Sequence, residues 1–144
     1  MKNKTAIRIG SRLWAGLGLL VCAALYFLIA PQVDGAEAAQ LGQGVELGQG
    51  FLMRGVAVVQ VLAGLWVLVM PRTGAGLTAS LTAVIGLSVI PRMSEPTALD
   101  LGLFAIDARF LIWTIEVIVV LAGLVVTFFW MTRNLNKRAA TAGR

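Results

Sequence analysis

The chain has 144 residues, of which 58% are hydrophobic and only 13% are charged, and its mean hydropathy is +0.86. This length fits one domain, and the composition excludes an ordinary soluble domain, so the expected solvent is lipid. The net charge is +5, but the basic residues flank apolar segments instead of forming one patch, which argues against nucleic acid as a partner.

Four apolar runs follow one another over residues 13–30, 51–70, 76–91 and 110–131. Each is near the roughly 20 residues that a helix needs to cross ~30 Å of hydrocarbon, although the third is short. We therefore predict an all-α integral membrane protein, a bundle of four transmembrane helices forming a single membrane domain. A cleavable signal is the alternative for residues 1–38, but its apolar stretch of about 18 residues exceeds the usual limit of about 15.

The charged residues predict the orientation of this bundle. Lys and Arg precede the first run and follow the fourth, and such an excess marks cytoplasmic segments. Both termini are therefore expected inside, with residues 132–144 as a cytoplasmic basic tail. The two connections expected outside, 31–50 and 91–109, hold every Asp and Glu except Glu116. Within the second connection, the apolar stretch 98–106 is expected to lie on the membrane surface or to cap the bundle.

Glu116 is the candidate functional residue, because a carboxylate inside an apolar span is costly unless another group pairs with it. From the predicted outer boundary, Arg54 lies about 5 Å deep, Glu116 about 9 Å and Gln60 about 13 Å. The polar residues expected to gather around Glu116 in the outer half are Arg54, Gln60, Arg109, Arg92 and Ser88. They predict an outer-leaflet pocket for a lipid, a quinone or a carboxylate ligand. A network that only locks the helices in register explains the same residues equally well.

Nothing near Glu116 in the sequence completes a catalytic set. The chain has no histidine, and Cys22 is its only cysteine, so ordinary metal and haem ligation within one chain is not expected. We expect no enzyme, no catalytic residue and no cofactor, but a ligand binder or an accessory subunit of a membrane complex. The alternative is a small proton-coupled exporter acting as a dimer through Glu116, although nearby arginines would repel cationic substrates. A third reading is a basic tail that docks on anionic lipid or a cytoplasmic partner.

The spans also resemble the DoxX-like four-helix membrane proteins. The residues that carry this resemblance within 10–131 are Met53, Arg54 and Gly55 at the start of the second span, Ala63 and Gly64 within it, Pro91 and Arg92 after the third, and Thr114, Ile115, Glu116 and Val117 in the fourth. The resemblance implies a bacterial inner-membrane protein. It also implies a role like that of relatives thought to accompany quinone-linked oxidoreductases as small subunits.

Overall fold

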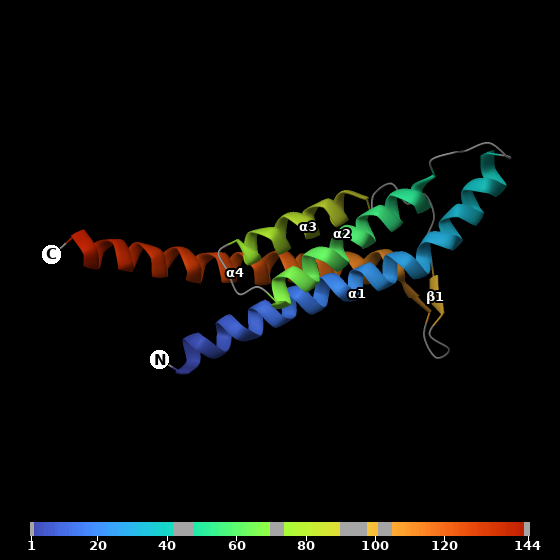
Figure 1. Cartoon of the computed structure of the whole chain (residues 1–144). Coiled ribbons are helices and arrows are strands. Elements are labelled where there is room, and N and C mark those ends of the chain that lie inside the picture. Colours follow the sequence, from blue (N-terminus) through green and yellow to red (C-terminus); the bar gives the residue numbers. More distant parts are fainter. Residues whose placement is uncertain (1, 42–47, 70–73, 90–97, 101–104, 143–144) are drawn as a thin grey trace.

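The structure, a computed structural model, describes residues 2–41, 48–69, 74–89, 98–100 and 105–142. In these ranges the chain forms four helices and two short strands: α1 (Lys2–Leu41), α2 (Gln49–Val69), α3 (Ala75–Val89), β1 (Ala98–Asp100), β2 (Ala105–Asp107) and α4 (Ala108–Ala142). Successive helices run in opposite directions, and both termini lie at the same end of the bundle (Figure 1). The prediction of a helical fold is confirmed.

Three of these helices are long and apolar enough to cross a membrane, over Ile9–Asp34, Gly50–Val69 and Ala108–Thr141. The third helix, α3, is also apolar but has only 15 residues, so it is about 22 Å long. Many large apolar side chains on the outside of the bundle are exposed, among them Leu62, Leu81 and Leu121. Such a surface fits lipid as the surrounding solvent, because a soluble protein rarely exposes a continuous apolar surface of this kind.

The first and last helices are longer than the predicted spans. α1 continues through Pro31 to Leu41. The predicted span ended at position 30, directly before this proline. Pro31 removes one backbone hydrogen bond, but the Ala-rich segment that follows has a high helix propensity and extends the helix. α4 likewise continues through the basic tail to Ala142. The tail is thus a helical extension of the last span, projecting past the bundle at the end that carries the termini (Figure 1).

Close helix packing depends on glycines at two crossings. Gly16 of α1 and Gly64 of α2 face each other, and a Cβ added at Gly64 would lie 3.0 Å from the carbonyl oxygen of Gly16. Gly76 of α3 and Gly123 of α4 meet in the same way at the second crossing. Small residues at such points let backbones approach closely in lipid. α1 packs mainly against α2 and α4, so α2 and α4 lie on opposite sides of the bundle axis.

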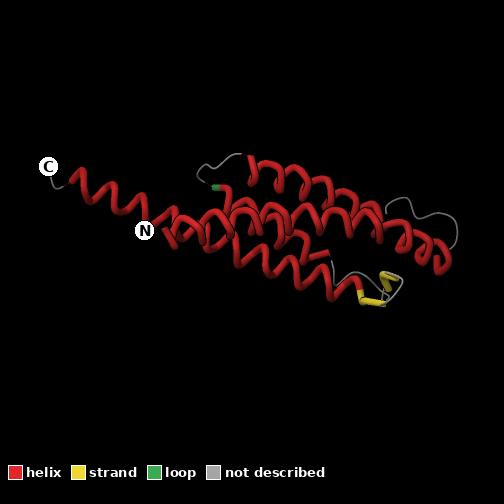
Figure 2. The backbone as a smooth tube through the Cα atoms, turned by 90° about the horizontal axis from the view of Figure 1, so that it is seen from below, coloured by secondary structure: helices red, strands yellow, loops and turns green. Residues whose placement is uncertain are grey.

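The connection before α4 contains an antiparallel hairpin at the end of the bundle opposite the termini, as Figure 2 shows. β1 pairs with β2 in the register Ala98 to Asp107, Leu99 to Ile106 and Asp100 to Ala105. This end of the bundle is called the hairpin end below. The expected membrane-surface or capping segment at 98–106 thus includes two strands, whereas 101–104 lies outside the described residues.

Candidate functional site

Glu116 of α4 and Gln60 of α2 meet at the centre of the bundle, and we call them the central polar pair. The side-chain nitrogen Nε2 of Gln60 donates a hydrogen bond of 2.5 Å to Glu116 Oε1. Both residues are fully buried, with 0% exposed. Because α2 and α4 face each other across the bundle axis, this bond connects two helices that have little other contact.

The other two helices close over this pair. Gly86 of α3 lies directly against it, since a Cβ added there would come within 2.6 Å of Gln60 Nε2 and would also overlap Glu116. From α1, Tyr26 is fully buried and its hydroxyl donates a 2.9 Å hydrogen bond to the carbonyl oxygen of Gly86. Cys22, one turn earlier on α1, is buried within interaction range of Glu116. All four helices therefore contribute to one polar centre.

Two oxygen atoms of this centre have no hydrogen-bond partner. They are Gln60 Oε1 and Glu116 Oε2, and both are buried. An unsatisfied buried acceptor costs about 1–3 kcal/mol, and more when the group is charged. Most buried polar atoms in proteins are satisfied, so these two unused acceptors are the unusual feature of this centre.

Two of the predicted arginines, Arg54 and Arg109, have partners other than Glu116. Arg54 pairs with Asp34 of α1 at 2.7 Å, and Arg109 pairs with Asp107 at 3.4 Å. These are the hairpin-end ion pairs. Both carboxylates lie close to the aqueous end of the spans, so each arginine meets a partner without entering the apolar core. Hydrogen bonds from Arg109 hold the pKa of Asp107 below its ordinary value.

Of the two remaining predicted site residues, Ser88 is described and does not lie in the centre. Ser88 is exposed, and its hydroxyl donates to the carbonyl of Ile85 on its own helix. Arg92 lies outside the described residues. Sequence reasoning did not bring Cys22 or Tyr26 to this centre, and it did not pair Asp34 with Arg54. The spacing of Cys22 and Tyr26, one turn apart on α1, was the available signal that both share a buried face.

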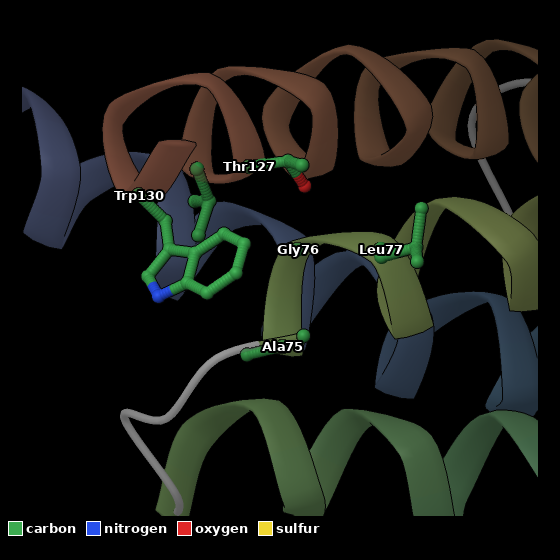
Figure 3. Close-up of a pocket in the computed structure, with 7 residues that line it drawn as sticks. Ala75, Gly76, Leu77, Thr127 and Trp130 are labelled. Atoms are coloured by element: carbon green, nitrogen blue, oxygen red, sulfur yellow. The ribbon is translucent and has the colours of Figure 1, made fainter. Parts of the chain in front are cut away.

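A cavity of about 280 Å³ lies at the end of the bundle opposite the hairpin, where α3 begins. Its lining is mostly apolar, and the indole of Trp130 points from α4 toward Ala75 and Gly76 (Figure 3). It lies at the end of the bundle that carries the termini, away from the hairpin end.

The central polar pair is suited to hydrogen bonding. Within the part of the chain that the structure describes, no group of three or more His, Cys, Asp or Glu side chains could hold a metal ion. No family model, curated protein or solved structure matches this chain. The site must therefore be interpreted from its own geometry.

Proposed function

We propose that this chain is an integral membrane protein of the bacterial inner membrane, with four crossings and both termini in the cytoplasm. The basic tail of α4 supports this orientation, because its Arg133, Lys137 and Arg138 are exposed at the end that carries the termini. Asp34 and Asp107 are at the opposite end, in the hairpin-end ion pairs. The 15 residues of α3 can cross where the bilayer thins around the bundle.

Its proposed role is non-enzymatic binding of a small polar group at the central polar pair. One observation carries this role: two fully buried side chains each present an oxygen without a donor. A donor group of a lipid or another small ligand would satisfy these oxygens, and Gln60 Nε2 can also donate to a quinone carbonyl. An anionic group fits less well, because the arginines expected to receive it are already paired with Asp34 and Asp107.

The test is purification of the chain from its own membrane in native nanodiscs, followed by intact mass spectrometry. A monomer or homodimer carrying a lipid or quinone supports the binding role. Glu116→Gln should lower that occupancy, whereas Ser88→Ala, at an exposed position bonded only to its own helix, should not. The proposal fails if the Glu116→Gln protein inserts stably and retains every ligand and partner of the wild type.

The same experiment tests the role of an accessory subunit, which the resemblance to DoxX-like proteins supports. The apolar exterior of the bundle could face either lipid or another subunit. Proteins that co-purify in stoichiometric amount would make the chain part of a larger membrane complex. The central polar pair would then act in fixing the register of α2 against α4.

A proton-coupled exporter acting as a dimer is the second candidate, and the position of the arginines favours it. Repulsion of cationic substrates by arginines around Glu116 was one of the arguments against this function. Arg54 and Arg109 are instead held by Asp34 and Asp107. Proteoliposomes should then show cation efflux driven by a proton gradient, and Glu116→Gln should abolish it. Efflux that persists in the Glu116→Gln protein excludes this function.

A further inference from the structure

The central polar pair has one donor too few. Gln60 Nε2 already donates to Glu116 Oε1, and the two atoms without a partner, Gln60 Oε1 and Glu116 Oε2, are both acceptors. An amide oxygen and an ionised carboxylate oxygen cannot form a hydrogen bond with each other, because both are acceptors. As an ionised carboxylate, Glu116 would be a charge in the apolar core supported only by the Gln60 hydrogen bond and the nearby Cys22 thiol, which is more costly than an unsatisfied neutral group.

The neighbouring helices provide no positive charge to offset it. The titratable groups that α1 places against the pair are Cys22 and Tyr26, which are neutral acids, and the Tyr26 hydroxyl already donates to a carbonyl of α3. α3 contributes Gly86, which has no side chain. Both described arginines of the hairpin end are bonded to aspartates there. Among the described side chains, none neutralises Glu116.

We propose that the central polar pair binds one exchangeable proton. The proton is taken from solvent water onto Glu116 Oε2, and the resulting hydroxyl donates to Gln60 Oε1. A single proton then satisfies both unpartnered oxygens. It completes a two-bond ring between a carboxylic acid and an amide, of which the observed Gln60–Glu116 bond is one half. This inference rests on the binding role proposed above and names the proton as the resident ligand of that site.

Proton binding would also couple to helix packing. Loss of the proton removes one of the two bonds between α2 and α4 and leaves a charge beside Gly86, where there is no space for a rearranged side chain. The deprotonated bundle must therefore either loosen around Glu116 or admit water. A proton-dependent change of this kind would give a small membrane protein a response to pH without any cofactor.

Infrared spectroscopy of the full chain in an ether lipid, which has no ester carbonyl to absorb near a carboxylic acid, tests this inference. At neutral pH, exposed Asp and Glu side chains are ionised, so a carbonyl stretch typical of a protonated carboxylic acid should come from Glu116 alone. We expect this band in the wild type, its shift in D2O, and its loss in the Glu116→Gln protein. The swapped double variant Gln60→Glu with Glu116→Gln keeps one acid and one amide, so it should restore the band.

Absence of the band in wild type at neutral pH, or its persistence in Glu116→Gln, would overturn the proposal. A band that disappears on addition of NaCl, but not of choline chloride, would show that the site binds a metal cation in place of the proton. That result would also overturn the proposal. These results are independent of the ligand search by mass spectrometry. The band can be present when no lipid or quinone is found, and a ligand can be found when the band is absent.

Discussion

Substitution of Gly123 by Ala tests the packing of α3 against α4. A Cβ at this position would lie 2.5 Å from the carbonyl oxygen of Gly76, whereas ordinary contacts begin at 3.4 Å, so the two backbones must separate by about 0.9 Å. The added methyl would also overlap Ser80, whose hydroxyl donates a 3.1 Å bond to the carbonyl of Val120. Overpacking of a tight core costs about 1–3 kcal/mol.

Gly55→Ala is the matched control, because nothing lies within 4 Å of a Cβ at Gly55 on the exposed face of α2. Both substitutions gain the helix propensity of Ala over Gly, about 0.8–1.0 kcal/mol. The difference between the two variants in the free energy of unfolding therefore isolates the packing term. It can be measured by circular dichroism during unfolding in mixed micelles of a mild detergent and SDS. Equal unfolding free energies for the two variants would refute the close crossing at Gly123.

Three further experiments probe the polar contacts. Tyr26→Phe removes the buried hydrogen bond to α3 and should lower the unfolding free energy by about 0.5–1.5 kcal/mol. An unchanged unfolding free energy would mean that this hydrogen bond is absent. A double-mutant cycle on Arg54 and Asp34, whose side chains are 42% and 38% exposed, should give a coupling of only about 0.2–1 kcal/mol. Arg109→Ala should raise the pKa of Asp107 toward its ordinary value in an NMR titration. Folding lowers the pKa of Asp107, so the ionised Asp107 stabilises the fold. This contribution is fully present at pH values above the ordinary pKa, and it is lost as the pH falls through the pKa of the folded state.

The sequence predicted the helices better than it predicted their side-chain partners. Apolar runs bounded by charge identified all four helices, because the period and length of such runs depend only on local residues. The depth argument also brought Gln60 and Glu116 to neighbouring levels, and the structure joins them by a hydrogen bond. The ends of α1 and α4 were not predicted, since a helix leaving the membrane continues wherever local propensity permits.

The arginines were misplaced because depth alone does not choose between partners. Arg54 and Arg109 each had a nearby aspartate at the aqueous end, and a charged pair formed there avoids the desolvation that a pair with Glu116 would require. Gly86 has no side chain and therefore carries no chemistry of its own. Its role in enclosing the central polar pair became visible only when α3 was placed against α2 and α4.

A functional role of the central polar pair predicts a different effect on stability than a purely structural role does. Replacing a buried polar pair by apolar residues of similar size is often neutral or stabilising, whereas removing one member leaves the other unsatisfied. Gln60→Leu combined with Glu116→Leu should thus unfold with a free energy equal to or above that of wild type, while Gln60→Leu alone should lose about 1–3 kcal/mol. The same unfolding titration measures both. A double variant less stable than either single variant would instead assign the pair to the fold, and the binding role would lose its main support.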